Sequence, residues 1–524
     1  MNVAHRPKAR INAFIGPVAA VIRRPILSRA PSDLMQTLGA TKKRVLPMRA
    51  MRFPRTVVTL FVVMLGPVPC TAQNDSTADR DRSAVLQWAR SSLSPLSTVK
   101  PGAPWSDLDP LLRMIGDAPL VATSEAVHMG AEPLEFRNRL FQYLVEKKGF
   151  TAIALESGIV EGRYLHDYVL GRTNDLNAAL ANGLTWNFDR LPQNAALLRW
   201  VREYNADPRH TRKLTVYGFD VPANNPQAKR GANTELMEAL KYLQQVDAAA
   251  ATAIQARGSA LIDKLRLDMG GAAYASGYDR LSVTERDTLT AVISDLVLLL
   301  ERKEAAYTAA SNQEDYQWGY RAALAARQKD NCQRQLPPPD WEPARSGHDA
   351  NDEPIRPFVA ATNDARDRAQ ADNLDWIVKR EGANGKVLIF ASRYHLSAMP
   401  VTTRWGSEAT APRNEQQVAG TYLRRRFGAR YVNIGNLISK GAFGCGDFQP
   451  LPPAPRHTID GLAGELAVPR FVLDVRTAPL AVKRWLAREH QLGPDDDALL
   501  LQMAQAYDIL FFLDTVSAAC PATH

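Results

Sequence analysis

Two short stretches of the chain place ionisable side chains directly after apolar segments. Glu125 and His128 follow residues 119–124, and Glu156 follows residues 151–155. A carboxylate or imidazole just past a buried strand costs free energy unless it is paired or faces a cleft. Histidine and glutamate are also the side chains that most often move protons in hydrolytic reactions. The two stretches therefore indicate acid–base chemistry if these groups meet.

Two further predicted strands end in the same way. Asp220 follows residues 213–219, and the stretch from Ser392 to His395 follows residues 386–391. In a parallel sheet all four ends lie at one edge, where ligands bind in open α/β folds. Taken alone, Glu156 or Asp220 is most often a helix cap or a loop anchor, and His128 is more often a loop histidine with satisfied hydrogen bonds than a catalyst. The convergence of two histidines with several carboxylates is what favours a functional site.

Several common catalytic motifs are absent from the sequence. It contains no Gly-x-Ser-x-Gly nucleophile elbow. It also lacks a P-loop, a complete Gly-x-Gly-x-x-Gly and a His-Glu-x-x-His. Ser157 lies in LESGIVEG, which does not have the elbow spacing. A serine hydrolase mechanism is therefore not predicted.

The positive charge of the chain is confined to its first residues. The net charge is +9, yet residues 1–72 hold 12 of the 64 Lys and Arg and one of the 55 Asp and Glu, so the remainder carries −2. A basic nucleic-acid footprint on the folded part is not predicted. Hydrophobic residues at 45% and charged residues at 23% are ordinary for a globular protein.

The basic excess belongs to a predicted export signal. Met51 starts a short basic segment, residues 57–65 are apolar, and small residues end at Ala72. This order is that of a secretory signal peptide, and its apolar part is too short to span a membrane. We expect an exported protein, periplasmic or secreted, without stable membrane insertion after cleavage. Residues 1–47 then form an upstream extension before the true start at Met48 or Met51.

Cleavage after Ala72 leaves three cysteines, Cys332, Cys445 and Cys520. An odd number in an oxidising compartment indicates one disulfide with one free thiol, or no disulfide. The sequence does not pair them.

Apolar periodicity gives the order of the elements. Strands are predicted at residues 119–124, 151–155, 213–219, 386–391, 430–434, 470–475 and 508–513. Helices are predicted at residues 134–148, 193–205, 234–257, 285–306, 314–328, 364–380, 416–427, 482–490 and 497–506. Residues 336–357, rich in proline and charge, are predicted to form a loop.

This order predicts an α/β fold with a mostly parallel sheet, flanked by helices and interrupted by a large helical insertion. The predicted parts are an upstream extension and signal peptide (1–72), a linker and N-terminal helix (73–112), the first part of the α/β core (113–220), a helical insertion or lid (221–363) and the second part of the core (364–524). The insertion covers the site or serves only as structural packing, and its aromatic residues favour packing by about two to one.

The residues at the strand ends also resemble a known family. The stretch from Ser124 to His128, with Arg137 nine residues further on, resembles the Gly-Glu-x-x-His-Gly motif of the erythromycin esterase family. Further similar motifs follow in the family's order: GFTAIALE (149–156), Trp186 with LLRWVREYN (197–205), VYGFD (216–220), RDRAQADNLDW (366–376), His395 and YDILFFLDT (507–515).

The resemblance implies hydrolysis of a carboxylic ester or lactone without a covalent enzyme intermediate. His128 is then the general base that deprotonates a water molecule, and Glu125 or Glu156 orients it. Arg137 is expected to offset the developing oxyanion. His395 is expected to position water or to protonate the leaving alkoxide.

Three more residues of these motifs are predicted to bind substrate: Arg366, Asp220 and Trp186. The resemblance implies a small-molecule ester or lactone as partner, with macrolides as one candidate class, and neither a cofactor nor a metal.

The sequence departs from the family in the presumed site. Relatives carry Ala-His-Asn-x-His after the fourth strand, whereas this chain has Ser392, Arg393 and Tyr394 between Ala391 and His395. Two alternatives therefore remain open. In the first, the same glutamate and histidine side chains bind a metal ion and the chain is a metal-dependent hydrolase. In the second, the chain is a non-catalytic relative that binds a small ligand.

Overall fold

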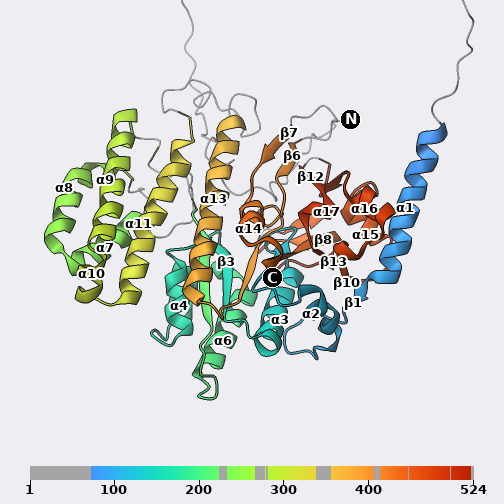
Figure 1. The fold of residues 1–524 in the computed structure, drawn as a ribbon, viewed down its shortest axis with the longest axis horizontal. Helices are drawn as coiled ribbons and strands as arrows, with labels where there is room; N and C mark the ends of the chain where they lie inside the picture. The colour runs from blue at the N-terminus through green and yellow to red at the C-terminus, as the bar shows by residue number, and fades with distance from the viewer. Residues whose placement is uncertain are drawn as a thin grey trace, which may run out of the picture.

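The computed structural model describes residues 72–222, 233–265, 278, 281–337, 356–405, 413–446, 448–495 and 497–520. Within these ranges the chain is a mixed α/β fold around a nine-stranded sheet (Figure 1). The expected leader up to residue 71 and residues 338–355 of the expected loop lie outside the described ranges.

The large sheet is mostly parallel, as predicted. Its strands follow the order β1-β10-β13-β8-β2-β5-β3-β4, and β9 pairs with the end of β8. The strands from β13 to β4 run parallel, whereas β1, β9 and β10 pair antiparallel. Their bounds are β1 Ser94–Pro95, β2 Leu120–Glu125, β3 Ala152–Gly158, β4 Thr215–Asp220, β5 Val387–Ser392, β8 Tyr431–Phe443, β9 Gln449–Leu451, β10 Arg470–Asp474 and β13 Ile509–Val516. All seven predicted strands belong to this sheet.

Helices cover both faces of the sheet. The flanking helices include α3 (Ala131–Lys148), α6 (Pro192–Ala206), α13 (Arg356–Glu381) and α14 (Ala419–Phe427). Successive strand residues point to opposite faces, so Val121 joins the apolar cluster that contains Leu140 of α3, whereas Ala122 joins the one that contains Leu374 of α13. A strand buried on both faces reads as a continuous apolar run, which is why these strands were recognisable.

The described residues between β4 and α13 form a helical block at the left of Figure 1. Its helices are α7 (Thr234–Val246), α8 (Ala248–Leu265), α9 (Val283–Arg302), α10 (Glu304–Ala310) and α11 (Gln313–Arg334). The predicted helix 234–257 is in fact two helices, because Asp247 interrupts it and its carboxylate accepts the N–H of Ala250 in the first turn of α8. The block has its own apolar core.

A second, four-stranded sheet corrects the prediction for the last third of the chain. Its order is β11-β12-β6-β7, with β6 at Val401–Trp405, β7 at Arg413–Gln416, β11 at Glu489–Leu492 and β12 at Asp497–Gln502. The predicted helix 497–506 was wrong over residues 497–502, because residues 498–501 are an apolar run that suits a strand as well as a helix. Its last four residues form the short helix α17 (Met503–Ala506). Antiparallel pairing of β12 with β6 and β11 selects the strand. The predicted helix 482–490 ends at Leu486, and β11 follows it.

The remaining described helices lie around these layers. They are α1 (Ala72–Ser92), α2 (Asp109–Ile115), α4 (Gly162–Val169), α5 (Leu176–Gly183), α15 (Ile459–Gly464), α16 (Leu480–Leu486) and α17 (Met503–Ala506). No helix in the described part of the chain is both long enough and apolar enough to cross a membrane. Cys445 and Cys520 form a disulfide, and Cys332 is a buried free thiol.

Candidate active site

Four neighbouring strands bring the predicted site residues to one edge of the sheet. The order β2-β5-β3-β4 is part of the large sheet, and all four strands run parallel. Glu125, Glu156 and Asp220 lie at or near their carboxyl ends, and His395 follows β5 by three residues. The sequence motifs that lie far apart in the chain thus meet at this edge.

Glu125 and His128 form a pair at the end of β2. Nδ1 of His128 lies 2.7 Å from Oε1 of Glu125. The Glu125 side chain is 2% exposed, whereas 27% of the His128 side chain is accessible. Burial acts to lower the pKa of His128, but the hydrogen bond and charge of Glu125 raise it above the ordinary value. Burial in turn raises the pKa of Glu125.

Glu156 is fixed by three groups from two other elements. Its Oε2 accepts the backbone N–H of Ser392 at 2.8 Å, and its Oε1 accepts Nη2 of Arg366 at 3.1 Å. Nε2 of His395 lies 3.3 Å from the same Oε1. Although burial acts to raise it, His395, His128 and Arg366 hold the pKa of Glu156 well below its usual range. Glu156 is therefore a permanent anion of the site.

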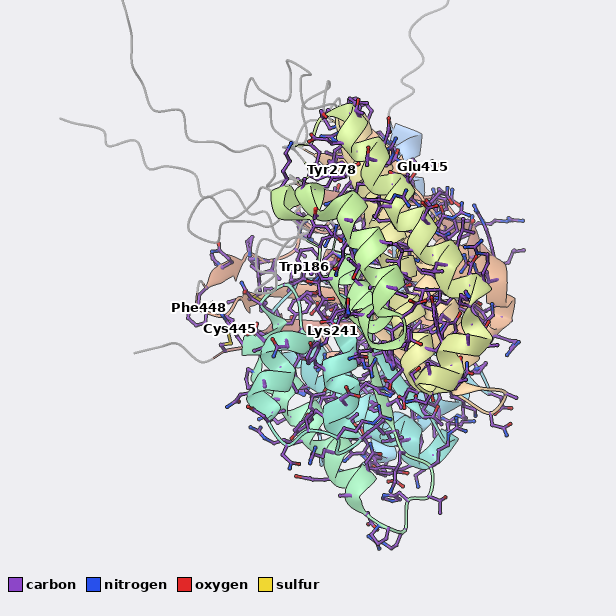
Figure 2. All side chains as sticks on the ribbon, turned by 90° about the vertical axis from the view of Figure 1, so that its left-hand side faces the viewer. Trp186, Lys241, Tyr278, Glu415, Cys445 and Phe448 are labelled. Carbon is purple, nitrogen blue, oxygen red and sulfur yellow. A yellow bond between two sulfur atoms is a disulfide. The ribbon has the colours of Figure 1, made fainter. Side chains whose placement is uncertain are left out.

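Asp220 binds the guanidinium of Arg366 through both oxygens. Nε of Arg366 donates to Oδ1 at 2.9 Å, and Nη2 donates to Oδ2 at 2.7 Å. Gln370 and Trp186 also donate to this carboxylate, at 2.9 Å and 3.2 Å. Trp186, labelled in Figure 2, has a φ of 62°, and the Arg366 guanidinium lies 5.3 Å from its ring centroid. Such left-handed backbone in a bulky residue is uncommon and marks a constrained position.

His395 is held from the opposite side by Asp367. Its Nδ1 lies 2.7 Å from Oδ1 of Asp367, which also accepts the N–H of Ala419 at 2.8 Å. Burial acts to lower the pKa of His395, but Asp367 and Glu156 raise it to about 9. The imidazole is therefore protonated at neutral pH, with Nδ1 facing Asp367 and Nε2 3.3 Å from both Oε1 of Glu156 and Nη1 of Arg366.

Asp367 and Gln370 were assigned no role from the sequence. Both lie within α13, one and four residues after Arg366, inside the stretch 366–376 that resembles the family motif. The spacing of four residues from Arg366 to Gln370, which places both on one helix face, was a further signal for Gln370.

Arg137, on α3, is buried beside two of the strand-end carboxylates. It is buried, donates to Asn138 and lies 4.8 Å from the ring centroid of Phe390. Together with Glu125 and Glu156 it lines a small cavity of about 10 Å³, which is room for about one water molecule. Burial lowers the pKa of Arg137 to about 9, and the negative charge of Glu125 acts in the opposite direction.

The residues that depart from the family pattern take structural positions around this site. Ser392 uses its backbone N–H to bind Glu156. The Arg393 side chain turns away and forms a buried ion pair with Asp460 at 2.9 Å. The ring of Tyr394 stands edge-on against His395 at 5.0 Å.

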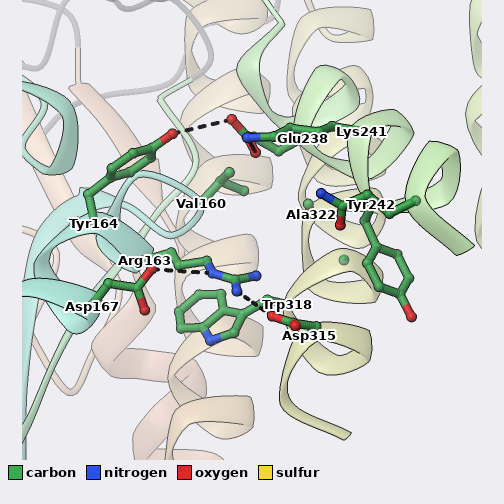
Figure 3. Close-up of a pocket in the computed structure, with 12 residues that line it drawn as sticks. Val160, Arg163, Tyr164, Asp167, Glu238, Lys241, Tyr242, Asp315, Trp318 and Ala322 are labelled. Atoms are coloured by element: carbon green, nitrogen blue, oxygen red, sulfur yellow. Dashed lines mark hydrogen bonds and ion pairs between the residues drawn. The ribbon is translucent and has the colours of Figure 1, made fainter. Parts of the chain in front are cut away.

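Two other features bear on the choice of chemistry. Among the described residues, no group of three His, Cys, Asp or Glu side chains has the arrangement of a metal site. A separate pocket of about 250 Å³ lies between α4, α7 and α11 (Figure 3), and none of the strand-end residues lines it. Its charged residues pair with one another, as Arg163 does with Asp167 and Asp315.

Comparison with known proteins points to one family. The family model for erythromycin esterase matches residues 145–516. Erythromycin esterase type II of Escherichia coli is 28% identical over 138 residues, which are 26% of this chain and 32% of that protein. Type I of Escherichia coli is 27% identical over 144 residues, which are 27% and 34%. The aligned part thus spans about a third of each curated relative.

Solved structures share the fold over most of the chain. A protein from Bacillus cereus has a TM-score of 0.64 at 24% identity, covering 83% of this chain and 98% of that one. A succinoglycan biosynthesis protein has a TM-score of 0.63 at 20% identity, covering 83% and 97%. A mutant of the erythromycin esterase EreC in its open conformation has 0.58 at 15%, covering 81% and 98%.

The family match contains Glu156, Asp220, Arg366 and His395, and begins after the loop that carries His128. It extends over well more than half of the chain, and the fold agrees with it. The chain belongs to the erythromycin esterase family.

Proposed function

We propose that this protein hydrolyses a carboxylic ester or lactone, with His128 as the general base that activates water. Membership of the erythromycin esterase family supports a hydrolase of esters. The observation that carries the finer proposal is the pair of His128 and Glu125, 2.7 Å apart, with the imidazole as the accessible partner. A base must reach solvent water, and its orienting carboxylate need not.

The pair gives His128 the required tautomer. An ionised carboxylate only accepts hydrogen bonds, so Nδ1 of His128 carries the proton donated to Glu125. Nε2 is then unprotonated and free to take a proton from water. Glu125 also stabilises the imidazolium that forms when the proton arrives. A positioned general base typically contributes about 10²–10⁴-fold in rate.

His395 supports the second proton transfer, to the leaving alkoxide. Its raised pKa of about 9 keeps it protonated at neutral pH, between Asp367 and Glu156. A proton donor with this pKa matches an alkoxide, which is far more basic than imidazole. After the transfer, Glu156 remains paired with Arg366, so the site keeps its charge balance.

Arg137 has a different role in this proposal from the one expected from the sequence. Its buried guanidinium, 1% exposed, is placed to compensate the charge of Glu125, with which it lines a small cavity. The group that faces the carboxylates from α13 is Arg366, which binds Glu156 and Asp220. We assign Arg366, Asp220 and Trp186 to the wall of the substrate site.

Turnover assays test the function directly. Purified protein is assayed against simple aryl esters, linear alkyl esters, small lactones and macrolide lactones, with product detected by mass. Macrolides belong in the panel because two relatives are named erythromycin esterases. Hydrolysis of at least one class supports the proposal, and binding without hydrolysis of any supports a non-catalytic relative. Assays after exhaustive chelation and metal analysis separate the metal-dependent alternative.

We also propose that the protein is exported through residues 51–72. The disulfide between Cys445 and Cys520 supports this, because such bonds persist in oxidising compartments. Fusion of residues 51–72 to a reporter that is active only after export tests the proposal. Mass analysis of the exported protein gives the cleavage position, which we expect near Ala72.

A further inference from the structure

The loop that carries His128 is held through one backbone carbonyl. Residues 126–130 join β2 to α3, and Met129 among them has a φ of 62°, which is rare outside glycine. The carbonyl oxygen of Met129 accepts the N–H of Gly444 at 3.1 Å and that of Ala519 at 2.9 Å. The two donors come from segments 75 residues apart, one after β8 and one after β13.

A disulfide joins these two donor segments. Cys445 directly follows Gly444, Cys520 directly follows Ala519, and their Cα atoms are 4.7 Å apart. Figure 2 shows Cys445 at an outer edge of the molecule. Both cysteines are partly exposed. The disulfide therefore joins the two segments whose N–H groups bind the carbonyl of Met129, the residue after His128. We call these two segments, residues 444–445 and 519–520, the cradle.

The rest of the loop is seated on the same C-terminal segment. Gly130 forms a bridge with Ala518, and the N–H of Ala131 donates to the carbonyl of Ser517 at 2.8 Å. A Cβ at Gly130 would come within 2.8 Å of the side chain of Val516. Gly130 therefore packs closely against Val516. A displacement of residues 516–519 would move both the loop and the start of α3.

The other flank of His128 is tied to this segment as well. The ring of Phe188 lies 5.7 Å from the imidazole of His128. Two residues later, the carbonyl oxygen of Arg190 lies 3.7 Å from the sulfur of Cys520. Nε2 of Gln193 donates to the carbonyl of Ala519 at 3.2 Å. The loop at Met129 and the ring of Phe188, which lie on two sides of the imidazole, therefore both depend on the position of the residues beside the disulfide.

We propose that Cys445 and Cys520 are positioning residues for His128: their disulfide fixes the cradle that aligns the imidazole with Glu125 and so supports catalysis. The inference rests on the proposed function of His128. Without the bond, the segments at 444–446 and 517–520 are joined mainly by single hydrogen bonds, each worth about 1 kcal/mol. Segments held in this way open locally at low free-energy cost.

Misplacement of the imidazole is expected to affect turnover more than binding. A displacement of about 1 Å in a reacting group can cost about 10²-fold in rate. Arg366 and Asp220, which we assign to the wall of the substrate site, bind each other and make none of these contacts with the disulfide segments, so ground-state binding is expected to depend on the disulfide less than turnover does. The expected signature is a fall in kcat with a nearly constant KM.

The test replaces each cysteine separately, as Cys445→Ser and Cys520→Ser. We expect kcat to fall at least about tenfold with KM within about twofold. NMR titration of ¹³C-labelled histidine, with the His128 signal assigned from a His128→Gln variant, gives a second readout. The pKa of His128 should fall in both variants, because the hydrogen bond with Glu125 that raises it is weakened. Wild-type kcat together with an unchanged His128 titration would overturn the proposal.

Reduction of the folded wild-type protein avoids reliance on the folding of the variants. Treatment with excess dithiothreitol converts the disulfide to two thiols as the reagent is oxidised to its cyclic disulfide, and mass analysis after alkylation counts the thiols. The same fall in kcat, reversed on reoxidation, supports the proposal. The control is Cys332→Ala, which removes the buried free thiol: it should respond to reduction as the wild type does. A reduced enzyme with full activity contradicts the proposal.

The two proposals fail in different ways. If the oxidised wild type hydrolyses no ester or lactone, the proposed function fails, while the histidine titration still reports whether the disulfide aligns His128. If the oxidised enzyme is active and reduction changes neither kcat nor the titration, only the positioning role fails.

Discussion

Nε2 of His395 lies 3.3 Å from Oε1 of Glu156, although 239 residues separate the two in the chain. One follows β5 and the other lies at the end of β3, its immediate neighbour in the sheet. The contact shifts the two pKa values in opposite directions: Asp367 and Glu156 together raise the pKa of His395 to about 9, and His395 lowers that of Glu156. Neighbouring side chains in this part of the site therefore alternate in charge, in the order Asp367, His395, Glu156 and Arg366.

This pair makes stability depend on pH in a defined window. The pKa of His395 is raised on folding, so its contribution is fully present below about 6.5 and is lost as pH rises through about 9. The loss is on the order of 3 kcal/mol. We expect the thermal midpoint of the wild type to fall more between pH 6.5 and 9.5 than that of His395→Gln. Equal changes in both proteins would show that His395 is not protonated in the native state.

The alkaline limb of the activity profile should report the proton on His395. Asp367→Asn keeps a hydrogen-bond acceptor for Nδ1 but removes the charge that contributes most to raising its pKa. We expect the alkaline limb of kcat/KM to move from near 9 toward lower pH. Asp364→Asn is the control, because Asp364 lies one turn earlier on α13 and accepts the N–H of Gln417. If the alkaline limb of kcat/KM stays at the wild-type pH in Asp367→Asn, His395 is not the group that transfers the proton.

The acidic limb should report the base. The hydrogen bond and charge of Glu125 raise the pKa of His128, and the base is active only when neutral. Glu125→Gln is therefore expected to move the acidic limb of kcat/KM to lower pH while kcat falls by about 10²-fold. A large fall in kcat with the acidic limb in place would mean that a group other than His128 titrates there.

Arg366 is expected to be the most important charged residue for stability at this edge. It is 4% exposed and compensates two buried carboxylates, Asp220 and Glu156. Removing one partner of a buried pair typically costs about 3–5 kcal/mol, so Arg366→Ala should lower the thermal midpoint strongly. Arg257→Ala is the matched control. It breaks an ion pair with Asp295 whose side chains are about half exposed, and such pairs contribute about 0–1 kcal/mol.

The candidate site was partly predictable because its residues end strands. Glu125, Glu156, Asp220 and His395 stand at abrupt changes from apolar to polar sequence, and parallel strands bring such changes together. Asp367 lies in the middle of a helix, where no such change marks it. Only the packing of α13 across the sheet brings its carboxylate to His395. The enclosed position of Arg137 is likewise set by tertiary packing that spacing in the sequence does not reveal.

The fold shows the same division between local and non-local information. β2, β3 and β5 were recognisable because each is a short apolar run buried on both faces. β12 was not, because its run of alanine and leucine suits a helix equally well, and only pairing with β6 decides it. The break between α7 and α8 depends on Asp247, which caps α8. The apolar periodicity continues across this residue and therefore predicted a single helix.

The most direct test of the account compares ester hydrolysis by the wild type with that by His128→Ala. We expect turnover to fall by at least about 10²-fold, while the circular dichroism spectrum stays close to that of the wild type, because the imidazole is partly exposed. The thermal midpoint is expected to fall moderately, because the buried Glu125 loses its hydrogen-bond partner. His210→Ala is the matched control, since the His210 ring bonds the backbone of Tyr204 on α6, and it should keep wild-type turnover. A folded His128→Ala enzyme with undiminished turnover would contradict the assignment of His128 as the base.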